Sequence, residues 1–194
     1  MMEDLLRMNC AIGLDLSLTS TGIVVLAQHG EVVHAEAICP TSKGIDRLGE
    51  IWASIADVYQ LAVYGKRLQV RDWVLEGYAY GAANAVAACA ELGGVVKYRL
   101  NDTLGQSFTV VPPSTLKKYV TSKGNAQKDE MRLSVFKRWQ FEHPSNDVVD
   151  AYGLARVGLA LAGLDPDLTA IQRQIVADLR GEKKAKKSRK KVAV

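Results

Sequence analysis

The alternation of hydrophobic and polar positions predicts short strands and amphipathic helices in a defined order. Three apolar runs rich in β-branched residues and bounded by turn residues predict three opening strands, at 11–16, 22–27 and 32–38. Two later apolar runs predict further strands, at 72–75 and 108–111. Helical spacing and capping residues predict helices, over 45–59, 82–98, 114–119, 127–139, 146–161 and near 167–179.

This order of elements predicts an α/β domain with a mixed sheet flanked by helices. No internal repeat is apparent, and no linker composition occurs before Gly181. We therefore expect one domain over residues 9–180. A basic tail follows over residues 181–194, and it has too few apolar side chains to offset the entropy of ordering it. The tail is expected to be disordered.

The basic residues are concentrated in that tail. The net charge is +4, but residues 180–194 hold eight Lys and Arg against one Glu, which leaves 17 basic and 20 acidic residues before them. A basic tail on an acidic body indicates a polyanion partner, nucleic acid ahead of membrane lipid, unless the tail only aids solubility. The tail residues assigned to DNA binding are Lys183, Lys184, Lys186 and Lys187.

Composition excludes several classes of protein. No run approaches eighteen apolar residues, so no transmembrane span is expected. The acidic start leads into no apolar segment of a secretory signal. Three scattered cysteines are too few for a disulfide framework or a four-cysteine zinc site. We expect a cytoplasmic protein with no membrane partner.

Two predicted strands end at a carboxylate. Asp15 follows the buried-type run AIGL, and Glu76 follows DWVL. A charge at the end of an inner strand is costly unless it is paired or binds a metal. Ligands of open α/β sheets bind outside the carboxyl ends of the strands. Asp15 and Glu76 are therefore candidate site residues.

The helix at 146–161 supplies two more acids. Asp147 and Asp150 are three residues apart and lie on one helical face, about 4.5 Å apart along the axis. Asp147 also fits an ordinary first-turn acid that complements the helix dipole. Asp150 leads directly into the apolar AYGLARVGLALAG stretch, so its side chain is expected near the edge of the core.

If the four acids converge, their repulsion requires divalent cations. Two like charges about 4 Å apart cost about 4 kcal/mol at an effective dielectric near 20. Carboxylates without His or Cys suit Mg²⁺ or Mn²⁺ rather than zinc. Paired ions of this kind serve in-line phosphoryl displacement. The residues thus predict a two-metal phosphodiesterase that uses two Mg²⁺, with Mn²⁺ able to substitute.

Four sequence blocks together resemble the RuvC-type Holliday junction resolvases of the RNase H-like superfamily. The resemblance spans about residues 10–163, in the blocks GLDLSLTSTG, VLEGYAYG, LKKYVTSKGNAQKDEM and NDVVDAYGLA. It implies an RNase H-like sheet of three antiparallel strands followed by parallel strands. It also implies that Asp15, Glu76, Asp147 and Asp150 bind the catalytic metals, and that Lys117 and Lys128 contact the scissile-strand phosphate.

The resemblance further implies branched DNA, especially four-way junctions, as the partner, and a C2 homodimer that matches the junction's symmetry. The helix at 82–98 is either the dimer surface or ordinary packing. Family members carry an aromatic residue three positions after the strand-end Glu, where this chain has Ala79. Its neighbours Tyr78 and Tyr80 either stack on unpaired bases or pack in the fold. The Lys-rich tail and this departure suggest a bacteriophage-encoded member.

Other readings of the same residues stay open. Lys117 and Lys118 fit either DNA contacts or an exposed helix face. His143, four residues before Asp147, either reaches the metal site or lies on a loop surface. The hydroxyl-rich run after Asp15 either binds phosphate or forms a plain turn. The same run resembles the phosphate loop of sugar-kinase and actin-like ATPases, but the chain has no second glycine-rich phosphate loop, so no nucleotide cofactor is expected.

Two alternative functions remain at this stage. The chain could be a nuclease for flaps, forks and other branched DNA rather than strictly for four-way junctions. It could also be a catalytically silent module that binds DNA junctions through Lys117, Lys118 and the tail.

Overall fold

Five strands form one mixed sheet in the computed structural model, which describes residues 7–77 and 83–182, apart from the side chains of 83–86 and 88. The strand order is β3-β2-β1-β4-β5. The pairings β1–β2 and β2–β3 are antiparallel, whereas β1–β4 and β4–β5 are parallel. The strands are β1 (Met8–Asp15), β2 (Thr21–Ala27), β3 (Val32–Ile38), β4 (Leu68–Glu76) and β5 (Phe108–Val111). This confirms the predicted sheet of three antiparallel strands followed by parallel ones.

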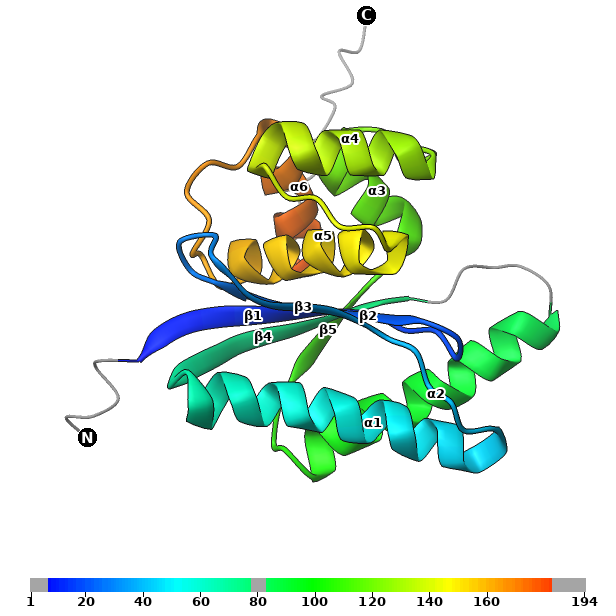
Figure 1. The fold of residues 1–194 in the computed structure, drawn as a ribbon. Helices are drawn as coiled ribbons and strands as arrows, with labels where there is room; N and C mark the ends of the chain where they lie inside the picture. Colours follow the sequence, from blue (N-terminus) through cyan, green and yellow to red (C-terminus); the bar gives the residue numbers. More distant parts are fainter. Residues whose placement is uncertain (1–6, 78–82, 183–194) are drawn as a thin grey trace, which may run out of the picture.

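Helices cover both faces of the sheet (Figure 1). On one face lie α1 (Gly44–Gln60), which continues into the π-helical turn η2 (Leu61–Gly65), and α2 (Ala83–Asp102). The other face is covered by α3 (Pro113–Thr121), α4 (Lys128–Trp139), α5 (Asn146–Leu161) and α6 (Ala170–Leu179). In the described part of the chain, no helix has the length and apolar character to span a membrane.

Strand alternation divides the core into two layers. On β1, Ile12 and Leu14 are fully buried on the side of α1 and α2, whereas Ala11 is fully buried on the side of α5. Because successive side chains point to opposite faces, Asp15 projects toward α5. On β4, Leu75 belongs to the first layer and Val74 to the second, so Glu76 also projects toward α5.

Helix α5 lies unusually close to the sheet because glycines face it. A Cβ on Gly13 would lie 2.0 Å from the carbonyl oxygen of Ala151, and one on Gly22 would lie 2.1 Å from that of Asp147. Such separations are possible only where the strand residue has no side chain. The close approach fixes the height of α5 above β1 and β2, and therefore the position of its acidic first turn.

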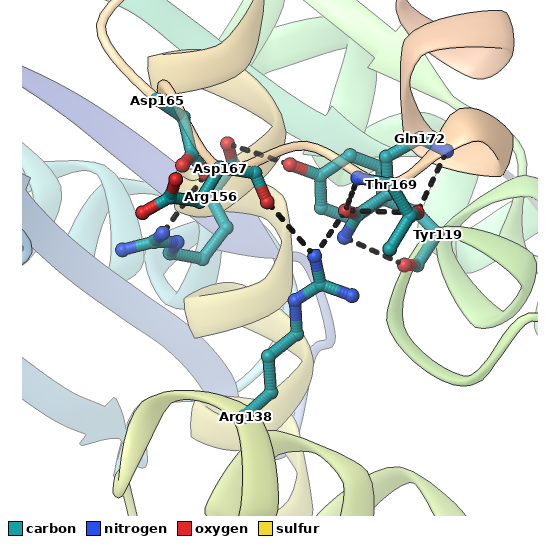
Figure 2. Close-up of polar contacts among 7 residues, drawn as sticks. All are labelled: Tyr119, Arg138, Arg156, Asp165, Asp167, Thr169 and Gln172. Carbon is teal, nitrogen blue, oxygen red and sulfur yellow. Dashed lines mark hydrogen bonds and ion pairs between the residues drawn. The ribbon is translucent and has the colours of Figure 1, made fainter.

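Two arginines fasten the outer helices, and Figure 2 shows their polar contacts. Arg138 of α4 donates to the backbone oxygen of Asp167 and to the side chain of Gln172 at the start of α6. Gln172 is almost fully buried and donates to the backbone oxygen of Tyr119. Arg156 of α5 forms an ion pair of 2.9 Å with Asp165, and both side chains are largely buried. These contacts hold α4, α5 and α6 together as one layer.

The structure corrects several element boundaries, among them that of β1, which spans Met8–Asp15 rather than 11–16. Strand β4 begins at Leu68 rather than at 72, because its first half alternates exposed and buried residues instead of forming an apolar run. Helix α3 begins at Pro113 rather than at 114, with Pro112 at the N-cap. A proline suits the first helical position because its fixed φ is already helical. Helix α2 continues to Asp102, beyond the predicted end at 98.

Candidate active site

The sheet brings Asp15 and Glu76 side by side. The preceding residues, Leu14 and Leu75, are paired on the adjacent parallel strands β1 and β4. Both carboxyl ends therefore reach the same edge of the sheet, and both acids project toward α5. Each of these two carboxyl groups shifts the pKa of the other, which indicates that the side chains of Asp15 and Glu76 lie close together.

The first turn of α5 brings the other two acids to this edge. Asp15 pairs with Gly22 across the β1–β2 ladder, and the backbone of Asp147 lies directly over Gly22. Asp150 follows one turn later on the same helix. The register of β1 and β2 and the missing side chain of Gly22 thus place Asp147 beside Asp15.

The electrostatics of the four acids indicate that they are close together. Burial raises the pKa of Asp15 well above its usual range, and the charges of Glu76, Asp150 and Asp147 raise it further. Burial, followed by the charge of Asp150, raises the pKa of Glu76 to about 7. Burial and the charge of Asp147 raise the pKa of Asp150 to about 6. These carboxyl groups are held together at a cost that bound cations would relieve.

Two of the predicted lysines contribute positive charge to the same cluster. Lys117 of α3 lowers the pKa of Glu76 and of Asp150, against the effect of burial. Lys128, the first residue of α4, lowers the pKa of Asp150. Lys118 is exposed on α3. The structure therefore brings Lys117 and Lys128 together with the acids, although these lysines lie far from Asp15 and Glu76 in the sequence.

The hydroxyl groups after Asp15 are engaged in a local turn. Thr21 is fully buried; its hydroxyl donates to the backbone oxygen of Ser17 at 2.7 Å and accepts from the backbone N–H of Ser17 at 3.1 Å. Thr19 and Ser17 also bond through their hydroxyls. These bonds fit the plain-turn interpretation of the run, and they fix the chain where it leaves β1.

His143 is also committed to a local contact. Its Nδ1 accepts the backbone N–H of Ser145 at 3.1 Å, just before α5. The hydroxyl of Ser145 in turn lies 3.5 Å from Oδ2 of Asp147. His143 therefore acts on the start of α5, and no contact joins it directly to the four acids.

The donor set fits Mg²⁺ or Mn²⁺ in its chemistry. The cluster consists of carboxylates, and burial together with their mutual repulsion raises the pKa of Asp15, Glu76 and Asp150. Within residues 7–77 and 83–182, however, no three His, Cys, Asp or Glu side chains already stand where they could hold one metal ion together. Metal binding would therefore require these carboxyl groups to be ionised and their side chains to rearrange.

The metal-free protein is expected to lose stability as the pH rises from about 4 to about 7. Glu76 and Asp150 have folded pKa values of about 7 and about 6, above their unfolded values of 4.5 and 3.8. Their favourable contribution is complete below the unfolded values and is lost as the pH rises through the folded ones. Thermal unfolding with and without Mg²⁺ tests this, because Mg²⁺ should raise the melting temperature more at pH 8 than at pH 5. An equal effect at both pH values would contradict the clustering.

Several predicted residues lie outside the described part of the chain. Tyr78 and Tyr80 fall between residues 77 and 83, and Lys183, Lys184, Lys186 and Lys187 fall after residue 182. Their assignment to DNA binding stays a prediction.

The sequence reasoning missed Gly22 and Arg132. A glycine inside the β-branched run 22–27 was a signal for Gly22, whereas nothing in the sequence marked Arg132, which bonds the loop before α5.

Comparisons with known proteins identify the fold of this chain. No protein-family model matches the sequence, and no curated protein sequence matches it. The Thermus thermophilus RuvC in complex with a Holliday junction substrate is similar, with a TM-score of 0.62 and 20% identity over 80% of this chain and 93% of that one. A second Thermus thermophilus RuvC structure has a TM-score of 0.58 and 21% identity, over 80% of this chain and 97% of that one. The yeast mitochondrial Holliday junction resolvase has a TM-score of 0.49 and 10% identity, over 90% and 82%. The two RuvC structures show that this chain has a RuvC-like fold.

Proposed function

We propose that this protein is a metal-dependent endonuclease that cleaves branched DNA, with the four-way junction as its principal substrate. The observation that carries the proposal is the convergence of Asp15, Glu76, Asp147 and Asp150 at one edge of a RuvC-like sheet. The RuvC of similar fold was solved with a Holliday junction substrate, which supports the choice of DNA. The proposed reaction is hydrolysis of one phosphodiester bond in each of two strands.

The four acids would hold two Mg²⁺, or Mn²⁺ in their place. Bound there, such ions would activate a water and neutralise charge on the phosphate and the leaving oxygen. The carboxylates fix where the phosphate sits, because they come from two strands and one helix of a rigid layer. The water oxygen bonds to phosphorus as the bond to the 3′ oxygen breaks, and the products are a 5′-phosphate and a 3′-hydroxyl.

The lysines would bind the DNA around that phosphate. Lys128 lies within electrostatic reach of Asp150, so its ammonium group is placed to stabilise charge that develops on the phosphate. Lys117 would hold the strand beside it. We further propose that Lys118, Tyr78 and Tyr80 contact the DNA, and that two copies of the chain form a C2 dimer for paired nicks. Origin in a bacteriophage, and action in the bacterial cytoplasm, belong to the same proposal.

A cleavage assay on matched substrates tests the proposed function. The full chain is incubated with an immobile four-way junction, a flap and a linear duplex, each in Mg²⁺ or in EDTA. We expect symmetric nicks in the junction that a ligase can seal, and none in EDTA. Equal rates on flap and junction would keep the chemistry but reject junction selectivity. Junction binding without any cleavage would reject the nuclease and favour a silent binding module.

Deletion of residues 181–194 is expected to weaken junction binding and reduce its dependence on salt. The deletion removes seven Lys and Arg residues. If all seven contact phosphates, the slope of log K against log salt falls by about 6. Cleavage at saturating protein should continue, because the acids and Lys128 are retained. An unchanged slope would remove the tail from DNA binding.

A further inference from the structure

Helix α4 is attached to its neighbours by two arginines, one near each end. Arg138, near the end of α4, bonds the segment before α6 and the side chain of Gln172 (Figure 2). Arg132, one turn after Lys128, bonds the loop before α5 instead. Its Nη1 donates to the backbone oxygen of Pro144 at 3.0 Å and to Oδ1 of Asn146 at 3.2 Å. The two attachments therefore serve different neighbours.

The loop that Arg132 binds leads directly into the acidic turn of α5. Asn146 is the first residue of α5 and precedes Asp147. Between the two accepting residues, Ser145 bonds the ring of His143 and approaches Asp147. The side chain of Ser145, the N-cap residue of α5, makes no capping hydrogen bond. Arg132 thus supplies side-chain hydrogen bonds across the junction between α4 and the segment that carries Asp147.

Met131 and Val135 of α4 are buried in the same core as Val149 of α5, but the part of α4 that carries Arg132 borders a hollow. This hollow of about 260 Å³ is open to solvent, and its lining includes Asp129 and Arg132 of α4, Glu142 and His143 of the loop, and Val149 of α5. Leu133 is 52% exposed, so it does not fill the gap. Beside this hollow, the hydrogen bonds of Arg132 add to the alignment that the packed core of α4 and α5 supplies.

Arg132 and the loop that it binds both lie beside the candidate active site. Lys128 and Arg132 are four residues apart and share one face of α4. The charge of Lys128 acts on Asp150, one turn after Asp147. A shift of α4 relative to α5 would therefore move Lys128 relative to the two aspartates.

We propose that Arg132 is a positioning residue that holds Lys128 in register with Asp147 and Asp150, by bridging the start of α4 to the loop at Pro144 and Asn146. This inference rests on the proposed function for its catalytic consequence. The structural part of the inference, that Arg132 holds the first turn of α5 in place, does not depend on the proposed function. The hydrogen bonds of Arg132 go to Pro144 and Asn146 and not to the four acids.

Arg138 provides a matched control. It lies on the same helix, and each arginine makes one exposed and one partly buried hydrogen bond across to a neighbouring segment. Arg132→Gln and Arg138→Gln should therefore have similar effects on stability. Arg132→Gln is expected to lower the nicking rate about 10- to 100-fold and to raise the Mg²⁺ concentration for half-maximal rate. Arg132→Lys should recover part of the loss, and Arg138→Gln should nick as the wild type does.

Two further readouts separate positioning from general loosening. In a Lys128→Ala background, Arg132→Gln should lower the nicking rate much less than it does in the wild type, because the group that Arg132 aligns is absent. In the metal-free protein, amide hydrogen exchange over Asp147–Asp150 should quicken in Arg132→Gln and not in Arg138→Gln. Unchanged exchange in Arg132→Gln would overturn the proposal, whatever the activity. A wild type that nicks no branched DNA would instead overturn the proposed function, while exchange still decides the role of Arg132.

Discussion

Replacing Asp150 with asparagine is expected to lower the rate of junction nicking by about 1,000-fold, the size of effect seen when one preorganised electrostatic group is lost. Asparagine has nearly the same shape but no charge, so it cannot neutralise a bound cation. The same change should raise the melting temperature of the metal-free protein. Asp150 has its pKa raised to about 6 by burial and by Asp147, so near neutral pH its charge is held at a cost. Single-turnover nicking and thermal unfolding measure the two effects.

Asp72 offers a matched control for Asp150. Burial also raises its pKa to about 6, and the hydroxyl of Thr109 donates to it at 3.2 Å. It lies on β4, four residues before Glu76, and none of the four clustered acids is among the causes of its shifted pKa. Asp72→Asn should therefore leave nicking at the wild-type rate. Equal loss of activity in both variants, or full activity in Asp150→Asn, would contradict the proposed role of the cluster.

Gly22→Ala is expected to destabilise the fold by about 3 kcal/mol or more, the upper range for overpacking a core. The added Cβ would lie 2.1 Å from the carbonyl oxygen of Asp147 and 2.8 Å from the backbone nitrogen of Val148. Both contacts are to helix backbone, which cannot turn away as a side chain can. Helix α5 would have to lift from the sheet at the end that carries Asp147 and Asp150, and nicking should fall with stability.

Gly49→Ala gives the opposite expectation in the same protein. Gly49 lies inside α1, and a Cβ there would meet nothing within 4 Å. Alanine in a helix interior is favoured over glycine by about 0.5–1 kcal/mol, so this variant should be slightly more stable than the wild type. Urea unfolding of the two variants beside the wild type measures both effects. A Gly22→Ala variant that unfolds at the wild-type urea concentration would contradict the close approach of α5.

Much of the fold could be predicted because the hydrophobic pattern of most elements matches their burial in the layers of the fold. Strand β1 is buried on both faces, so its sequence is a continuous apolar run that stops at Asp15. The boundary errors arose where a pattern was weaker. The first half of β4 alternates exposed positions, such as Gln69 and Arg71, with more buried ones. A search for apolar runs therefore does not detect it.

The candidate site was predictable as residue types but not as a geometry. The position of Asp15 and Glu76 at strand ends follows from the sequence, since parallel strands bring their carboxyl ends to one edge. The height of α5 above the sheet does not follow from the sequence, because a glycine such as Gly22 signals a close approach without indicating which element approaches. The bridge from Arg132 to Asn146 joins two helices across a loop, and no local pattern records it.

Counting bound Mn²⁺ tests the central claim most directly, namely that the four acids form one metal centre. Electron paramagnetic resonance of the full chain at increasing Mn²⁺ gives the number of bound ions and their affinity. We predict about two ions in the wild type and in Asp72→Asn, with weaker or lost binding in Asp150→Asn. Asp150→Asn protein that binds as many ions with the wild-type affinity would contradict the account.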